Sequence, residues 1–156
     1  MTPRTALVAP LVLAALACSP HRIPGTQVRD TADNRAVYDV LQAYRQAMEK
    51  RDAPAVLALV APDYRDTAGT ADPADDLDRA MLEQTLPKDL ARAEALRVEF
   101  TVRRIDVQDD TAEAELFYDQ YYRVKTPGGE VPRRDSDVHR MKLRRIDGAW
   151  KISGGL

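Results

Sequence analysis

Residues 96–107 read LRVEFTVRRIDV, and this stretch decides the fold. From Leu96 to Val102 every second residue is apolar, and the residues between are charged or carry a hydroxyl. This alternation predicts a strand with one buried face and one solvated face. The apolar positions shift by one residue at Arg103 and Arg104, which predicts a β-bulge in that strand.

The alternation continues towards the C-terminus and predicts three more strands. Turns are expected at residues 108–110 and 127–129 and at the dipeptide Asp147-Gly148, which is typical of a tight hairpin. Consecutive strands joined by short turns predict an antiparallel meander. The further side chains expected on its inner face are Ala112, Ala114, Leu116, Tyr118, Gln120, Tyr122, Asp137, His139, Met141 and Leu143.

The first half of the chain has a helical period instead. In residues 31–51 apolar side chains recur at spacings of three and four, and Thr31 or Asp33 is expected to cap the predicted helix. A second helix is expected between Asp52 and Pro62. A third is expected to open at Pro73 and Ala74, to turn Leu77, Met81 and Leu82 inward, and to break or bend at Pro87. Helices followed by a meander predict an α+β domain, with three helices on one sheet face.

The composition excludes several classes of function. The chain has 156 residues, a net charge of −2 and one cysteine, so it lacks the basic excess of a nucleic-acid-binding protein and cannot form an internal disulfide. It contains no glycine-rich phosphate loop. Acidic residues gather at Asp63 and Asp66 and again between Asp72 and Asp78, but neither group has the spacing of a metal site. We therefore expect no metal, no cofactor and no nucleic-acid partner.

The N-terminus carries a targeting signal. Residues 1–17 combine one arginine with an apolar run too short to span a bilayer, and they end in small residues before Cys18. This order resembles the lipobox of bacterial lipoproteins, which implies a cleaved signal peptide and a lipid on Cys18 that attaches the protein to a membrane. An ordinary signal peptide is the alternative. Ser19 stands where an inner-membrane protein would carry aspartate, which favours the outer membrane, facing the periplasm.

The domain boundary is expected near residue 30. Residues 18–30 contain two prolines, one glycine and no hydrophobic period, so they are expected to be the lipidated cysteine and a flexible tether. His21 within them is expected to be solvated. The folded domain is then expected to span residues 31–156.

Four motifs follow one another along that domain. They are an opening helix with Tyr44, KRDA at residues 50–53, PDY at residues 62–64 and RIDGAWKI at residues 145–152. In this order they resemble the nuclear transport factor 2-like (SnoaL-like) superfamily, over residues 33–156. The resemblance implies a cone, in which a curved antiparallel sheet wraps around three helices and leaves a pocket. Similar domains serve as isomerases, dehydratases, cyclases, enzyme subunits, carriers and interaction modules, so no single activity is implied.

A pocket is expected where the inner sheet face meets the first helix. Its predicted lining is Tyr44, Tyr64, Tyr118, Gln120, Tyr122, Asp137 and His139. Asp137 and His139 lie two residues apart on one strand face and are candidate catalytic residues, because burial would raise the pKa of an aspartate to suit proton abstraction. The alternative is that His139 is a wall residue and that Asp137 pairs with Arg134 or another arginine.

The outer sheet face is expected to be charged. Its basic residues, Arg140, Lys142, Arg144 and Arg145, are expected to face Glu113 and Glu115 on the neighbouring strand. Phe117 and Tyr121 fall on the same face, where exposed apolar area favours a homodimer interface.

Three functions are compatible with these patterns. The favoured hypothesis is a non-catalytic, lipid-anchored module that binds a small apolar ligand or a protein at the cell envelope. The alternatives are a cofactor-free acid–base isomerase or dehydratase that uses Asp137 and His139, and a structural envelope protein with a filled pocket. An open cavity in which Asp137, His139 and a tyrosine converge would favour the enzyme.

Overall fold

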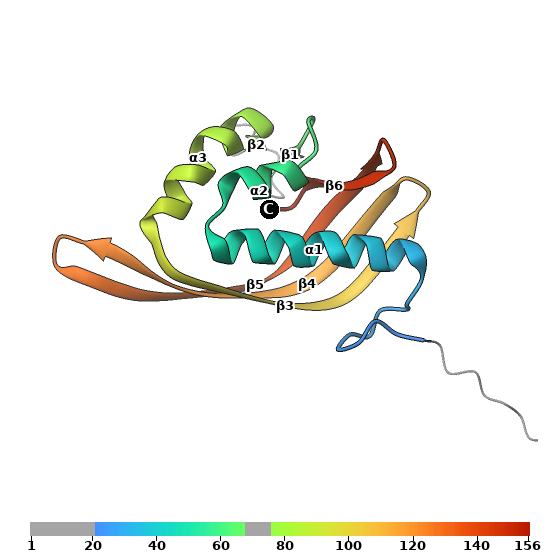
Figure 1. The fold of residues 1–156 in the computed structure, drawn as a ribbon, viewed down its shortest axis with the longest axis horizontal. Helices are drawn as coiled ribbons and strands as arrows, with labels where there is room; N and C mark the ends of the chain where they lie inside the picture. The colour runs from blue at the N-terminus through green and yellow to red at the C-terminus, as the bar shows by residue number, and fades with distance from the viewer. Residues whose placement is uncertain (1–20, 68–75) are drawn as a thin grey trace, which may run out of the picture.

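Figure 1 presents the computed structural model of the chain, which describes residues 21–67 and 76–156. Within these residues, three helices pack on one face of a curved four-stranded antiparallel sheet, and two short strands pair beside them. The predicted α+β class, with three helices on a curved antiparallel sheet, is therefore confirmed. In chain order the elements are α1 (Ala32–Lys50), α2 (Ala53–Leu59), β1 (Arg65–Asp66), β2 (Leu77–Asp78), α3 (Arg79–Arg92), β3 (Ala93–Gln108), β4 (Thr111–Thr126), β5 (Gly129–Ile146) and β6 (Ala149–Gly154).

Side-chain caps fix where the first two helices begin. The Thr31 hydroxyl accepts a hydrogen bond from the backbone N–H of Asn34, as predicted, and the Asp52 carboxylate does the same for Ala55 at the start of α2. The side chains that α1 buries are Val37, Leu41, Tyr44 and Ala47. This apolar stripe holds α1 along the inner face of the sheet, where its closest strand is β3.

The third helix differs from its prediction. The Asp78 carboxylate accepts a hydrogen bond from the N–H of Met81, so α3 begins directly after it and Leu77 lies in β2 instead. Met81 is 46% exposed, so it does not face inward, and the helix continues through Pro87. Residues 73 and 74, where the sequence predicts the helix start, lie outside the described residues.

The sheet confirms the predicted meander, because its strand order is β3-β4-β5-β6 with antiparallel neighbours. The predicted bulge in β3 lies between Val102 and Arg104. A second irregularity, which the sequence pattern does not predict, lies between Glu94 and Arg97, where Ala95 has a φ of 50°. Irregularities of this kind bend a strand and increase its twist, and the sheet curves beneath the helices.

The predicted flexible tether is wrong over residues 21–30. Here Arg22 and Arg29 form an antiparallel bridge, and Ile23 and Val28 lie in the core with exposures of 1% and 4%. The segment is one tight loop and neither a helix nor a strand, so its two apolar residues carry no period that a sequence argument can detect. The folded domain therefore already includes residue 21.

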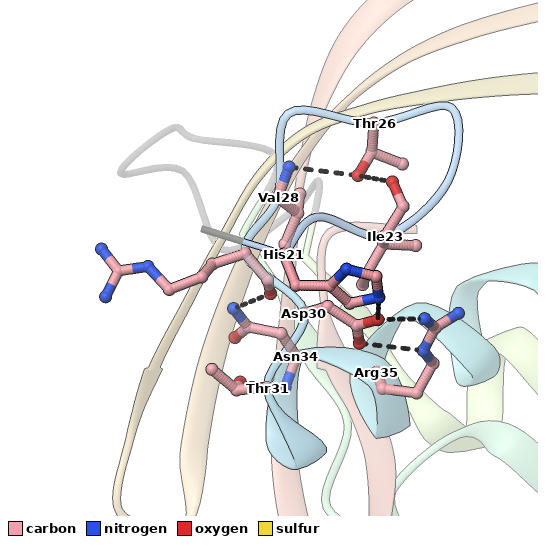
Figure 2. A network of polar contacts seen from close by, with 9 residues as sticks. His21, Ile23, Thr26, Val28, Asp30, Thr31, Asn34 and Arg35 are labelled. Atoms are coloured by element: carbon pink, nitrogen blue, oxygen red, sulfur yellow. Dashed lines mark hydrogen bonds and ion pairs between the residues drawn. The ribbon is translucent and has the colours of Figure 1, made fainter. Parts of the chain in front are cut away.

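A polar network joins this loop to the start of α1, as Figure 2 shows. The Arg35 guanidinium donates to Asp30, with Nε 3.1 Å from Oδ1. Nε2 of His21 lies 3.4 Å from the other oxygen of Asp30, although the histidine side chain is 84% exposed. The side-chain amide of Asn34 donates to the carbonyl oxygen of Arg29 at 2.9 Å. The loop is thus held by buried apolar side chains on one side and by ionic contacts on the other.

The last residues of the chain return to the centre of the molecule. A Cβ atom at Gly154 would lie 2.9 Å from the carbonyl oxygen of Arg65, and one at Gly155 would lie 2.2 Å from that of Arg140. Gly155 also has a φ of 85°, which favours glycine. This close packing brings Leu156 to the wall of the cavity described below.

Residues 1–20, and with them the predicted signal peptide and Cys18, lie outside the described residues. Among the helices of the described part, none is both long enough and apolar enough to cross a membrane.

Candidate ligand-binding cavity

A cavity of about 430 Å³ lies between the inner face of the sheet and helices α1 and α3. Its volume falls in the range of small-molecule sites in proteins. Most of its wall is apolar. The aliphatic residues that border it include Met48, Val56, Leu82, Leu86, Leu90, Leu96, Leu116, Met141 and Leu156.

Four rings from four elements form a row along the cavity wall. Tyr44 of α1 stacks on Phe100 of β3, with centroids 5.8 Å apart and an interplanar angle of 17°. The ring centroid of Phe100 lies 5.5 Å from that of Tyr118 in β4, and the Tyr118 centroid lies 4.9 Å from that of His139 in β5. The strand register explains the row, because Phe100 and Tyr118 are directly paired and both point to the inner face.

The two tyrosines of this row have different polar contacts. The Tyr118 hydroxyl donates to the side-chain oxygen of Gln120. Tyr44 is only 7% exposed, and its hydroxyl has no hydrogen-bond partner among the described residues. Burial raises the pKa of Tyr44 well above its ordinary value, and the nearby Tyr118 and Tyr64 phenols add to the effect. The Tyr44 phenol therefore stays protonated and offers a hydrogen-bond donor.

Asp137 and His139 both border the cavity, but they do not form the expected acid–base pair. Asp137 is exposed, and its Oδ1 accepts a hydrogen bond from the N–H of Val138 at 2.7 Å. His139 is half-buried against the Tyr118 ring, and no hydrogen bond joins it to Asp137 within the described part of the chain. The burial expected for Asp137 is absent, because residues 132–138 of β5 are all exposed.

Six of the seven predicted pocket residues border the cavity, and Tyr64 is the exception. Tyr64 is 2% exposed, and its hydroxyl donates to Asp66 at 3.4 Å and accepts a hydrogen bond from the N–H of Leu156 at 3.2 Å. It therefore joins β1 to the C-terminal segment. Burial raises the pKa of Tyr64.

Sequence reasoning missed Phe100 and the aliphatic wall of α3 as cavity residues. The alternation around Phe100 predicts that its ring lies on the inner face, so the sequence is sufficient to assign this residue to the cavity. In α3, Leu82 faces inward as predicted, whereas Leu86 and Leu90 are not predicted, because their orientation depends on where the Asp78 cap starts the helix. In residues 21–67 and 76–156, no three histidine, cysteine, aspartate or glutamate side chains gather into a metal-binding group.

On the outer face Arg134 pairs with Asp119 and not with Asp137, for which the described residues offer no arginine partner. His139, by contrast, does lie in the cavity wall, as the alternative expected. Nε and Nη2 of Arg134 donate to the two carboxylate oxygens of Asp119 at 3.0 and 2.8 Å, and Asp119 is 8% exposed. The Tyr121 hydroxyl donates to the same carboxylate at 3.1 Å. The hydrogen bonds from Arg134 lower the pKa of Asp119, against the effect of burial.

The expected basic run on this face divides into two parts. The register places Glu115 opposite Arg140 and Glu113 opposite Lys142, as predicted. The other two arginines pair with acids from the first half of the chain: Arg144 with Asp63, and Arg145 with Asp33. Strand alternation puts Arg145 on the face opposite to Arg144, which is why a run of four basic residues cannot share one surface.

Apolar side chains also remain exposed on the outer face. Tyr121 is 39% exposed and Val138 is 42% exposed. Phe117 is half-buried, with the Arg103 guanidinium 5.7 Å from its ring centroid. The two expected aromatic residues therefore lie on this face, and Val138 lies directly opposite Phe117 on β5.

The comparisons with known proteins identify a family and a fold. A family model described as the SnoaL-like domain matches residues 37–154. No curated protein matches the sequence.

Several solved structures share the fold. One is a proposed dehydratase of the NTF2-like family from Streptomyces avermitilis, with 19% identity, coverage of 79% of this chain and 93% of that chain, and a TM-score of 0.65. Another is a proposed scytalone dehydratase from Novosphingobium aromaticivorans (15% identity, 79% and 80% covered, TM-score 0.63). A third is a proposed calcium/calmodulin-dependent protein kinase II association domain from Xanthomonas campestris (18% identity, 87% and 90% covered, TM-score 0.59). Since these three proteins carry different names at low identity, the likeness establishes the fold alone.

Proposed function

The chain belongs to the SnoaL-like family, and we propose that its cavity binds a small, mostly apolar ligand with a planar ring and does not transform it. We also propose that the protein is lipid-anchored at the cell envelope. One observation carries the proposal of ligand binding: a row of four rings lines the cavity, and Tyr44, at one end of the row, has a hydroxyl without a hydrogen-bond partner among the described residues.

The ring row supports a planar, apolar ligand. Offset or tilted contacts between aromatic rings contribute about 0.5–1.5 kcal/mol each beyond the area that they bury. The leucines of α3 border the same cavity, so a flat molecule would be in contact with rings and aliphatic side chains together. A cavity of about 430 Å³ is large enough for a molecule of one or two fused rings.

The Tyr44 hydroxyl supports a hydrogen-bond acceptor on that ligand. The hydroxyl has no protein partner among the described residues, so it can donate to a ligand oxygen, and a hydrogen bond of this kind contributes about 0.5–1.5 kcal/mol. Since burial keeps the phenol protonated, it donates and does not attract a cation. The ligand class that this arrangement favours is a neutral ring system with one carbonyl or hydroxyl oxygen.

A matched pair of probes tests this proposal. We expect 2-acetylnaphthalene to bind, and we expect Tyr44→Phe to weaken its affinity by about 2- to 12-fold, because only the hydrogen bond is removed. 2-Isopropylnaphthalene has a similar shape without an acceptor, so its affinity should change little. Isothermal titration calorimetry measures both. The proposal would be contradicted if Tyr44→Phe lowered the affinity for both probes equally, or if neither probe bound to the unchanged protein.

The second candidate is a cofactor-free isomerase or dehydratase. It is favoured by the position of Asp137 and His139 on the same cavity as Tyr118, and by the names of two similar structures. The exposed Asp137 carboxylate, bonded to a backbone N–H, speaks against it as a buried base. With a substrate in hand, unchanged turnover in both Asp137→Asn and His139→Ala would exclude this candidate. A structural protein with a filled pocket is the weakest of the three, because the cavity is open.

The lipid anchor rests on the pattern of residues 1–18. We expect mass spectrometry of the N-terminal peptide to find a diacylglyceryl group and an amide-linked acyl chain on Cys18, and globomycin to block its processing. Membrane fractionation should place the protein in the outer membrane. A soluble periplasmic product with a free Cys18 thiol would contradict the anchor.

A further inference from the structure

The docked loop at residues 21–30 contacts the start of α1, whereas the cavity is lined by Tyr44 and Met48 in the second half of that helix. The loop packs at the start of α1 and borders a surface groove shared with the turn between β3 and β4. Asp89, near the C-terminal end of α3, and residues 135–137, in the middle of β5, line the cavity and are exposed, so we place its mouth there.

We propose that the docked loop orients the anchored domain, with the cavity mouth pointing away from the membrane that holds the lipid. This inference rests on the lipid anchor proposed above. It adds a source for the ligand, which would enter from the aqueous space or from a protein facing that space, and not from the anchoring bilayer.

The length of free chain is the first argument. If residues 19–30 were unfolded, they would allow the domain to move about 40 Å from the lipid. Because residue 21 is already part of the folded domain, only Ser19 and Pro20 separate Cys18 from it, a reach of about 10 Å. The strand β4 alone has 16 residues, which corresponds to about 50 Å of strand. The tether is therefore short compared with the domain.

The strength of the docking is the second argument. The loop buries Ile23 and Val28 in the main core, and its two halves are joined by the bridge between Arg22 and Arg29. Asp30 then links it to Arg35 in the first helical turns (Figure 2). A loop held by core packing and by a charged hydrogen bond moves with the domain, so the point where the chain leaves it is fixed.

Energy transfer to the membrane tests the orientation. The full chain is produced in a bacterium that processes lipoproteins, with a fluorescent amino acid at Gln108 or at Gly128, and is reconstituted into phosphatidylcholine vesicles that carry a rhodamine-labelled lipid. Gln108 lies in the turn region beside the docked loop, and Gly128 lies at the tip of the β4–β5 hairpin. We expect transfer at least twofold more efficient from position 108 than from position 128. Equal transfer, as from a domain lying on its side, would overturn the proposal.

An insertion provides the matched control. About 12 glycine and serine residues between Pro20 and His21 lengthen the tether and leave every described residue unchanged. The difference between positions 108 and 128 should then largely disappear. A difference that survives the insertion would also overturn the proposal, because another surface would then set the orientation.

Failure of the anchor can be separated from failure of the orientation. The mass of the N-terminal peptide reports whether Cys18 is acylated in the same preparation. If it is not, the anchor is wrong, and the protein is then coupled through Cys18, the only cysteine in the chain, to a maleimide-bearing lipid. The same two transfer efficiencies then decide the orientation on its own.

Discussion

Asp119 is a nearly buried acid on the outer face of the sheet, and it depends on Arg134 and Tyr121 for all its side-chain hydrogen bonds within the described structure. Arg134 lowers its pKa in the folded protein below the value of about 3.9 expected for an unfolded chain. The ionised carboxylate therefore adds stability above that pH, and the gain is lost as pH falls through the lower folded value. We expect Asp119→Asn to be less stable than the unchanged protein at pH 7, and we expect this difference to shrink as the pH is lowered to 2.5, as measured by urea unfolding.

The control for this residue is an exposed acid with a similar ion pair. Asp106 lies 2.8 Å from Arg104, and both side chains are about half exposed. Exposed pairs of this kind contribute little, so Asp106→Asn should change stability by less than about 1 kcal/mol at either pH. A loss for Asp119→Asn that is equally large at both pH values would show that its role is steric and not ionic.

At the scale of elements, the loop at residues 21–30 should behave as part of the core. Ile23→Ala removes most of a side chain that is 1% exposed, and we expect it to lower the free energy of unfolding by about 2–5 kcal/mol. Gln27→Ala, at an exposed position of the same loop, should change it by less than about 0.5 kcal/mol. Chemical denaturation measures both, and two equally small effects would mean that the loop is not docked in solution.

The elements that the sequence predicts well are those with a repeated pattern. Alternation from Leu96 onwards locates all four long strands and even the bulge near Arg103, because one-sided burial repeats every two residues. The docked loop is missed, since two apolar residues five positions apart form no period. The start of α3 is missed because one capping carboxylate, Asp78, outweighs the proline signal upstream of it.

The candidate site follows the same division. The strand pattern predicts that Tyr118 and His139 lie on the inner face, and both border the cavity there. The pattern does not state what covers that face, and this is why Asp137 is exposed where burial was expected. Tyr64 lies in a loop, and its position depends on contacts with the distant Leu156 that no local pattern contains.

At the scale of the whole molecule, we propose that two copies pair through the outer sheet face. Val138 is exposed there opposite the half-buried Phe117, and Tyr121 is exposed four residues further along β4, with the Arg134 guanidinium 4.9 Å from its ring centroid. We expect a dimer in native mass spectrometry, and Val138→Arg should weaken its association at least tenfold by placing a charge in an apolar contact. Gln108→Arg adds the same charge at an exposed position at one end of the sheet and should leave the dimer intact. A monomer in the unchanged protein would end this proposal.

Gly154 and Gly155 have a consequence for the size of the cavity. Both lie where a methyl group would press against main-chain oxygens, and Leu156, the next residue, forms part of the cavity wall. Alanine at Gly155 would act as a wedge that drives the end of the chain away from β5 and pulls Leu156 out of the wall with it. The absence of side chains at Gly154 and Gly155 therefore keeps Leu156 in the wall and helps to set the volume of the cavity. These two glycines lie far along the chain from Tyr44 and Phe100, whose rings would contact a guest molecule.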